Sequence, residues 1–220
     1  MTELILKVVG SYLIGSLIGS LIVGRLRGGV DIRTLGSGNA GGTNALRTQG
    51  KAFALWVMLI DVGKGIVATR VIAPLSLQAL GVAGVGGEAL RVWLPVACGF
   101  AAIIGHIYPV WHGFRGGKGV ATFVGVLFGV EPLLLLVVVL TWLVVVMLFG
   151  FVSLASMVST AAVPVIVLVG GLQPQTPLLA FGVAATLLVA YTHRSNIARM
   201  RAGTESRARR LWLFGRGRTR

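Results

Sequence analysis

The sequence predicts an all-α integral membrane protein with about seven transmembrane helices, its N-terminus outside and its C-terminus in the cytoplasm. Three observations support this prediction: long apolar runs, few charged residues, and basic residues gathered in a few loops. Of the 220 residues, 55% are hydrophobic and 12% are charged, whereas a soluble domain has about 25% charged residues. Most polar side chains must therefore lie in loops or line a polar site.

The apolar runs cover about 4–23, 53–73, 90–108, 120–151, 154–171 and 177–192. The first run is not a convincing signal peptide, because Arg25 and Arg27 follow it directly and no small-residue cleavage site does. These two arginines should hold its C-terminal end in the cytoplasm and leave the N-terminus outside.

The fourth run decides the number of spans. It is too long for one helix of about 20 residues and short for two. A turn at Glu131-Pro132 would give seven spans and would place the 24–52 loop, the 112–118 loop and the tail in the cytoplasm. Most of the basic residues lie in these three segments, so the positive-inside rule favours seven spans. Pro132 also suits the first position of a helix, where its missing N–H costs nothing.

The charge balance is strongly basic, with 20 Lys and Arg against 6 Asp and Glu. In a membrane protein this excess is first a topological feature, and we expect no nucleic-acid partner. The single cysteine, Cys98, excludes an internal disulfide and a cysteine-based zinc site. We expect one polytopic domain over 1–207 and a basic cytoplasmic tail over 208–220 near anionic headgroups.

Four polar clusters should converge at the cytoplasmic ends of the helices. They cover residues 37–47, 105–122, 153–156 and 193–205. The first contains Gly36-x-Gly38-x-x-Gly41, which resembles a dinucleotide-binding fingerprint, but no strand precedes it and no βαβ unit surrounds it. The second contains Gly117-Lys118, but His112 stands where a phosphate loop needs its first glycine, and Gly119 where it needs Ser or Thr.

What survives is the chemistry that both motifs share. Glycines let successive backbone N–H groups converge on an anion, and the N-terminus of a following helix adds its dipole. Arg47 and Lys118 add positive charge next to the two loops. The sequence therefore predicts a site for a phosphate-bearing substrate at one membrane face.

Histidines and intramembrane charges complete the candidate residues. His193 lies at the end of the last run with Asn196 three residues on, so both should share one helix face. A histidine there could polarise or deprotonate a hydroxyl. His106 and His112 flank an aromatic stretch and could be interfacial. Asp61 and Lys64 are spaced to pair inside a span, and we interpret them as an ion pair that supports the site.

Residues 37–47, 105–122 and 193–205 resemble, in order and spacing, the three motifs of the bacterial membrane glycerol-3-phosphate acyltransferases that use acyl phosphate as donor. The resemblance covers nearly the whole chain. Ala40 and Gly42 depart from the usual proline and alanine of the first motif, and Arg207 stands where lysine is common. These changes remove no hydrogen-bonding side chain from the loop and no charge from the third motif.

The resemblance implies that the 1-hydroxyl of sn-glycerol 3-phosphate attacks a long-chain acyl phosphate, giving 1-acylglycerol 3-phosphate (lysophosphatidic acid) and inorganic phosphate. This is the first acylation of phospholipid biosynthesis, in the bacterial inner membrane with a cytoplasmic active site. It implies no cofactor or metal, and a monomeric enzyme in the lipid bilayer. The expected catalytic residues are His193, Asn196, Ser37 and Lys118. The expected substrate-binding residues are Gly38, Asn39, Gly41, Thr43, Asn44, Arg47, His106, Gly116, Gly117, Ser153, Ser156 and Glu205.

Two other functions remain to be tested. A transporter for phosphate esters would place its site at the midplane between related repeats, but the clusters lie at one face and no repeat is evident. A CDP-alcohol phosphotransferase would need an aspartate-rich metal motif, and the chain has two aspartates, Asp31 and Asp61. The His-x-x-x-x-Asp pair of thioester-using acyltransferases is also missing, since Trp111, Gly117 and Ala198 stand five residues after the three histidines.

Overall fold

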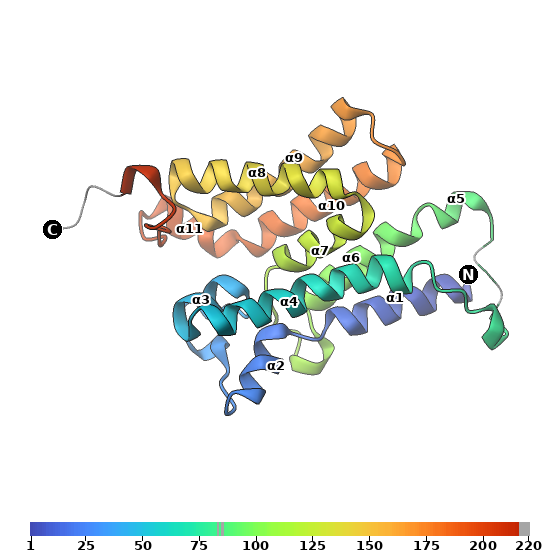
Figure 1. Cartoon of the computed structure of the whole chain (residues 1–220), viewed down its shortest axis with the longest axis horizontal. Helices are drawn as coiled ribbons and strands as arrows, with labels where there is room; N and C mark the ends of the chain where they lie inside the picture. The colour runs from blue at the N-terminus through green and yellow to red at the C-terminus, as the bar shows by residue number, and fades with distance from the viewer. Residues whose placement is uncertain (83, 85, 216–220) are drawn as a thin grey trace. The chain divides into compact units, whose positions relative to one another are not determined.

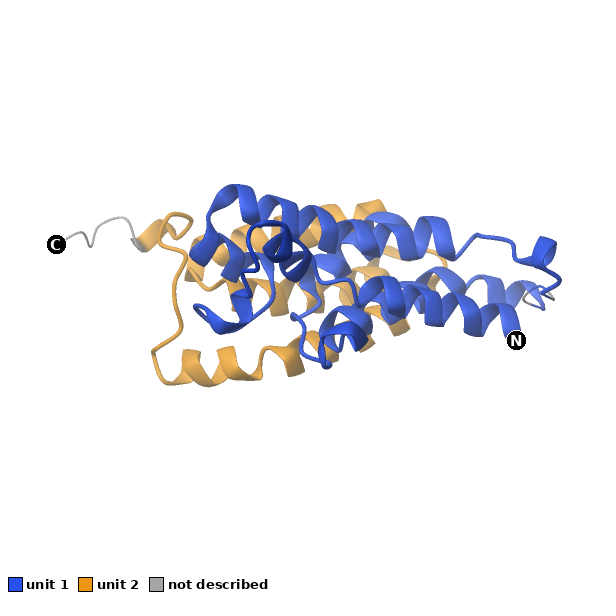
Figure 2. Ribbon diagram, turned by 90° about the horizontal axis from the view of Figure 1, so that it is seen from below, with its two compact units in different colours: residues 1–131 blue, residues 132–220 orange. Residues whose placement is uncertain are grey.

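The computed structural model describes residues 1–82, 84 and 86–215 (Figure 1). All regular elements within these residues are helices, so the predicted all-α class is confirmed. The chain divides into two compact units, Met1–Glu131 and Pro132–Arg220, which Figure 2 shows in different colours.

The first unit contains seven α-helices and four shorter turns. The helices are α1 (Thr2–Gly15), α2 (Gly19–Leu26), α3 (Gly42–Gln49), α4 (Lys51–Val67), α5 (Glu88–Arg91), α6 (Leu94–Ile107) and α7 (Val120–Val130). A π-helical turn, η2 (Ala68–Ile72), continues α4, and 3₁₀ turns lie at η1 (Ile32–Thr34), η3 (Gln78–Leu80) and η4 (Val110–His112).

Small residues let the helices of this unit approach closely. The main contacts join α1 to α6 and α4 to α7. A Cβ on Gly15 would overlap the backbone of Ala102, and one on Gly125 would overlap the carbonyl of Val62. Glycine is required at both positions because backbone faces backbone, which is the usual way in which apolar helices pack in a membrane.

The first apolar run differs from the sequence-based expectation of one continuous span. It forms two helices, α1 and α2, bent by 47° at residues 16–18. Buried side chains of α4 bind the backbone at this break: the Lys64 ammonium donates to the Leu17 carbonyl over 2.9 Å, and Asp61 Oδ1 accepts from the Gly19 N–H over 3.1 Å. A broken helix is tolerated inside a membrane protein where such groups satisfy the freed backbone.

The second unit contains α8 (Pro132–Phe149), α9 (Val152–Gly170), α10 (Gln175–Thr192), α11 (Arg194–Arg201) and the 3₁₀ turn η5 (Leu213–Gly215). Helix α9 packs against both α8 and α10. Helix α7 ends at Val130 and α8 begins at Pro132, so the helix break predicted at Glu131-Pro132 is confirmed.

Five described helices are long and apolar enough to cross a membrane, or six if α1 and α2 form one bent span. Helix α7 is apolar but has only 11 residues. The number of seven spans and the orientation of the termini stay predictions. Large apolar side chains on α8, such as Leu136 and Leu140, are exposed, as expected for a helix surface that contacts lipid.

The segment after α11 packs onto the junction of α8 and α9. Trp212 donates its indole N–H to the Leu148 carbonyl over 3.2 Å, and the Ala208 N–H donates to the Gly150 carbonyl over 2.8 Å. The Arg207 guanidinium lies 4.1 Å from the centre of the Trp212 ring. Of the basic tail expected over 208–220, residues 216–220 lie outside the described part of the chain.

Candidate functional site

The buried Asn44 side chain organises the first glycine loop. Its Nδ2 donates to the carbonyls of Ile32, Leu35 and Asn39 over 2.9–3.0 Å, and its Oδ1 accepts from the Ser37 N–H over 3.0 Å. Asn44 is 2% exposed, so it holds the loop from beneath. The sequence marked Asn44 as substrate-binding, whereas the geometry shows it bonded to its own loop.

Glycines give this loop its shape. Gly36 and Gly38 have φ of 57° and 70°, in the left-handed region that favours glycine. Gly41 is the N-cap residue of α3, so the loop leads into a helix N-terminus as expected. Ser37, Thr43 and Arg47 are exposed and Asn39 is partly exposed. Ser37 and Gly38 donate their N–H groups within the loop, to Asn44 Oδ1 and to the Leu35 carbonyl, so the anion-binding feature of this loop is the N-terminus of α3.

The second loop, residues 113–119, turns back on the end of α6. The Gly116 N–H donates to the Ile107 carbonyl over 3.1 Å, and the Gly117 N–H donates to the His106 carbonyl over 3.0 Å. Gly119, with φ of 85°, then caps α7. Lys118 is partly exposed between Gly117 and that cap. The loop therefore shares with the first its glycines and the helix N-terminus that follows, but its basic residue precedes that helix, whereas Arg47 lies in the last turn of α3.

Arg33 joins the two loops, and the sequence interpretation missed it. Its guanidinium pairs with Asp31 over 2.7 Å and donates to the carbonyls of His112 and Arg115 over 3.3 and 3.1 Å. Hydrogen bonds from Arg33 are the main cause of the lowered pKa of the Asp31 carboxyl, although partial burial opposes them. The spacing of Asp31 and Arg33 is visible in the sequence, but the two carbonyls that Arg33 binds lie 79 and 82 residues away from it.

His106 lies beneath the second loop. The residue is 2% exposed, and its Nδ1 lies 2.7 Å from the Lys64 ammonium and 3.4 Å from Asp61 Oδ1. Asp61 and Lys64 form an ion pair of 2.9 Å, which confirms the pairing predicted from their spacing. The ring is enclosed by helices, so the expected interfacial position of His106 differs from the structure, while its expected role in substrate binding stays a prediction.

In the second unit, Glu205 binds Asn196 and Arg199 of the preceding helix and Ser153, which is 52 residues away. Its Oε1 accepts from Ser153 Oγ over 2.9 Å and from Asn196 Nδ2 over 2.6 Å, and its Oε2 accepts from Arg199 Nε over 2.7 Å. Burial favours the neutral acid, but these hydrogen bonds outweigh it and lower the pKa of Glu205 below its usual value. The carboxylate is therefore charged at neutral pH and fixes the Asn196 amide.

His193 lies where α10 ends and α11 begins, three residues before Asn196, and both are buried. Its Nδ1 lies 2.8 Å from the Val189 carbonyl. A carbonyl oxygen accepts only, so Nδ1 carries the proton, and Nε2 is the accepting nitrogen of the neutral ring. This tautomer is the one that a histidine needs to take a proton from a hydroxyl.

Ser156 is engaged within the helices. Its hydroxyl donates to the Val152 carbonyl over 2.9 Å and accepts from the Trp142 indole over 3.3 Å. Among the described residues there is no group of three or more His, Cys, Asp or Glu that could hold a metal ion. That the loops of the first unit and the Glu205 network of the second serve one site stays a prediction.

Comparison with known proteins identifies the family of this chain. The family model of glycerol-3-phosphate acyltransferase matches residues 5–203. Proteins named glycerol-3-phosphate acyltransferase from Allorhizobium ampelinum and Chlorobium luteolum are 38% and 36% identical to this chain. The alignments cover 94% of this chain and 93% and 97% of those proteins.

Solved structures give the same result. Crystal structures of PlsY (YgiH), an integral membrane glycerol 3-phosphate acyltransferase, in its glycerol 3-phosphate and lysophosphatidic acid forms, match with TM-scores of 0.78 and 0.77. They are 35% and 34% identical, and each match covers 93% of this chain and 94% of the other. The chain therefore belongs to the glycerol-3-phosphate acyltransferase family of integral membrane enzymes.

Proposed function

We propose that this enzyme transfers a long-chain acyl group from acyl phosphate to the 1-hydroxyl of sn-glycerol 3-phosphate. The observation that carries the proposal is the pair of glycine loops, each followed by a helix N-terminus and linked through the hydrogen bonds of Arg33. Two anion sites suit a reaction in which both substrates carry phosphate. The two structural relatives, in glycerol 3-phosphate and lysophosphatidic acid forms, support the same acceptor and product.

In the proposed reaction the 1-hydroxyl oxygen attacks the acyl carbonyl, the bond between that carbon and the phosphate oxygen breaks, and inorganic phosphate leaves. The products are 1-acylglycerol 3-phosphate and phosphate. The hydroxyl proton passes to His193 Nε2 or to the departing phosphate, which is itself a good leaving group and a competent base.

Each residue set has a proposed role. Arg47 and Lys118 neutralise phosphate groups, and the backbone of 37–42 and 116–119 lines the pockets. Ser37, Asn39 and Thr43 add short-range hydrogen bonds. In the second unit, His193 contacts the attacking hydroxyl and Asn196 orients glycerol phosphate, with its amide held by Glu205.

The proposed setting is the bacterial cytoplasmic membrane. We propose that the N-terminus lies outside and that both glycine loops and the C-terminus lie in the cytoplasm, because most basic residues are in those segments. The enzyme would act as a monomer on a lipid-borne donor and a water-soluble acceptor, with the single polytopic domain ending near residue 207.

The test is an assay of the purified enzyme in detergent with acyl phosphate and labelled glycerol 3-phosphate. We expect lysophosphatidic acid and inorganic phosphate in equal amounts, and no product when an acyl thioester replaces acyl phosphate. His193→Ala and Lys118→Ala should each lower kcat/KM by about 100-fold, the range for one catalytic contact. Wild-type turnover in both variants contradicts the assignment, and uptake of phosphate ester into proteoliposomes without acylation indicates a transporter.

A further inference from the structure

A fully enclosed cluster of ionisable side chains lies inside the first unit, beneath the second glycine loop. Asp61, Lys64 and His106 are 0%, 4% and 2% exposed. None of the three takes part in the substrate contacts proposed above. Charged groups at such depth are expensive and are usually kept for a function.

Lys64 is the centre of the cluster. Its ammonium lies 2.9 Å from Asp61 Oδ1, 2.7 Å from His106 Nδ1 and 2.9 Å from the Leu17 carbonyl. An ammonium has three protons and no acceptor, so these three partners use its full donating capacity. The cluster thereby ties α4 to α6 and to the break between α1 and α2.

The same contacts fix the protonation of the histidine ring. Lys64 donates to Nδ1, so Nδ1 is the accepting nitrogen of a neutral ring and the proton lies on Nε2. The Nε2 side of the ring faces the second loop, because a Cβ added to Gly117 would overlap this atom. The ring plane and its Nε2–H are thus set against the backbone of Gly117.

The backbone of the same residue completes the contact. The His106 carbonyl accepts from the Gly117 N–H, and a Cβ on Gly116 would overlap that carbonyl oxygen. The loop therefore lies on His106 through both its ring and its carbonyl, and a rotated ring would displace Gly117 and the adjoining Lys118.

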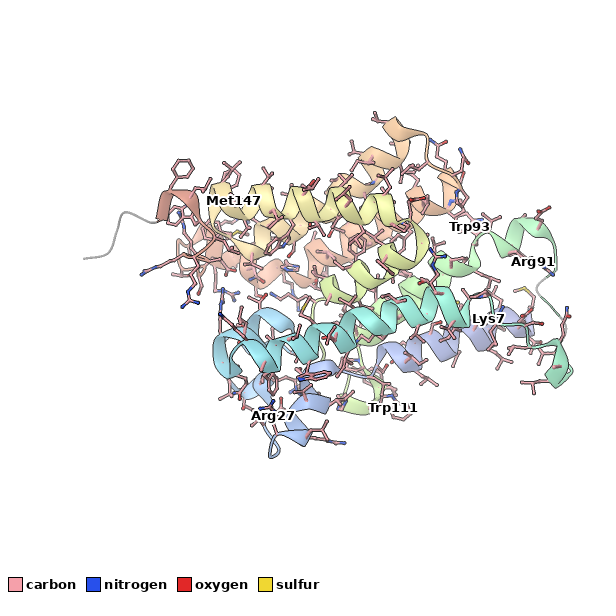
Figure 3. The ribbon with its side chains drawn as sticks, in the orientation of Figure 1. Lys7, Arg27, Arg91, Trp93, Trp111 and Met147 are labelled. Atoms are coloured by element: carbon pink, nitrogen blue, oxygen red, sulfur yellow. The ribbon has the colours of Figure 1, made fainter. Side chains whose placement is uncertain are left out.

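Glu3 and Lys7 provide a matched internal comparison. They form a second ion pair of 2.9 Å in the same unit and are 5% and 4% exposed. Lys7 also donates to a carbonyl, that of Ala73, over 2.9 Å. This pair lies near the N-terminal end of α1, and Figure 3 shows Lys7 and Arg27 toward opposite ends of the unit.

We propose that Asp61 and Lys64 are positioning residues that hold His106 in one tautomer and orientation, and that His106 braces the Gly116–Lys118 loop in its anion-binding shape. The inference rests on the proposed function in one respect, that this loop binds a substrate phosphate. It assigns the ion pair to substrate affinity and excludes it from the acyl-transfer step.

The test compares two double variants. Asp61→Leu/Lys64→Met removes both buried charges together, since removal of one alone leaves the other unpaired. It also removes the partners of the Leu17 carbonyl and the Gly19 N–H, so its stability is measured alongside its activity. Glu3→Leu/Lys7→Met makes the same replacement away from the loop. His106→Asn keeps an acceptor for Lys64 but removes the Nε2 side of the ring.

We expect Asp61→Leu/Lys64→Met and His106→Asn to raise KM for one of the two phosphate substrates about tenfold, the effect of losing one hydrogen bond. Their kcat should stay within about twofold, and Glu3→Leu/Lys7→Met should match the wild type. Thermal unfolding of each variant in the same detergent separates this effect from loss of folded protein.

Lys118→Ala, measured alongside, distinguishes failure of this inference from failure of the proposed phosphate-binding role of the loop. A raised KM in Lys118→Ala with a wild-type KM in Asp61→Leu/Lys64→Met overturns the inference and leaves the proposed function standing. An unchanged KM in both overturns the phosphate assignment of the loop. An equal rise of KM in both double variants also overturns the inference, because it shows a general effect of buried charge.

Discussion

Asp61 in the first unit and Glu205 in the second each gather a cation and other polar groups around one carboxylate. Asp61 is fully buried within α4, and its partner Lys64 is buried as well. Glu205 follows α11, where Arg199 pairs with it from a side chain that is 39% exposed. The cations therefore differ more than the carboxylates: Lys64 is enclosed, whereas Arg199 is partly exposed and the Glu205 side chain is 8% exposed and keeps Ser153 and Asn196 as further donors.

The difference shows what each network is suited to do. A buried pair cannot lose one member without leaving an uncompensated charge, so it fixes helix geometry permanently. A partly exposed pair contributes little through its charges. Glu205 instead orients a neighbouring side chain. Its two oxygens accept from Ser153, Asn196 and Arg199, and this fixes the orientation of the Asn196 amide, three residues after His193.

Removal of the cation from each network should give the largest difference in stability between the two. Lys64→Met leaves the Asp61 carboxylate buried and should lower the free energy of unfolding by about 3–5 kcal/mol. Arg199→Met should cost about 0–1 kcal/mol, since Arg199 is partly exposed and Ser153 and Asn196 still donate to Glu205. Thermal unfolding of both variants in one detergent measures the difference, and equal losses would contradict the comparison.

The pH dependence of the second network follows from the lowered pKa of Glu205. When a carboxyl has a lower pKa in the folded state than in the unfolded state, its contribution to stability is present above the unfolded-state pKa and is lost as pH falls through the folded-state pKa. The contribution of Glu205 should thus be constant near neutral pH and decline below about pH 4.

Glu205→Gln should flatten that part of the profile. The measurement is the unfolding midpoint of wild type and Glu205→Gln between about pH 3 and 7, with Glu88→Gln as the control because that exposed residue is far along the chain from this network. A profile that keeps its acid decline in Glu205→Gln would show that another group causes it.

Composition, charge asymmetry and proline chemistry were enough to predict the helical membrane fold and the break at Glu131-Pro132. They could not predict the bend between α1 and α2, because the groups that satisfy its backbone, Asp61 and Lys64, lie more than 40 residues away. An apolar run shows where a helix is stable, while a break within it depends on tertiary partners.

In the candidate site, too, some features could be predicted from the sequence and others depended on tertiary contacts. The glycine loops and their following helices were visible from residue types and spacing. The roles of Asn44 and His106 were not, because a polar side chain in a motif can face a ligand or its own loop, and only packing decides between them. Arg33 was missed because its local pairing with Asp31 gave no sign of the carbonyls that it binds.

The last comparison concerns one neutral donor to Glu205. Ser153→Ala removes one of its three hydrogen-bonding partners and should cost about 1 kcal/mol, a shift of about 2–4 °C in unfolding midpoint for a chain of this size. Ser159→Ala is the matched control, because Ser159 is buried on the same helix and donates to the Ser156 carbonyl of its own helix over 3.2 Å.

Both serine variants should lose similar stability, but they should differ in turnover. If Glu205 acts by directing the Asn196 amide, Ser153→Ala should reduce kcat/KM several-fold while Ser159→Ala leaves it unchanged. Equal activity in the two would mean that Asn196 and Arg199 suffice to orient the carboxylate. The contrast between the Glu205 and Asp61 networks would then rest on burial alone.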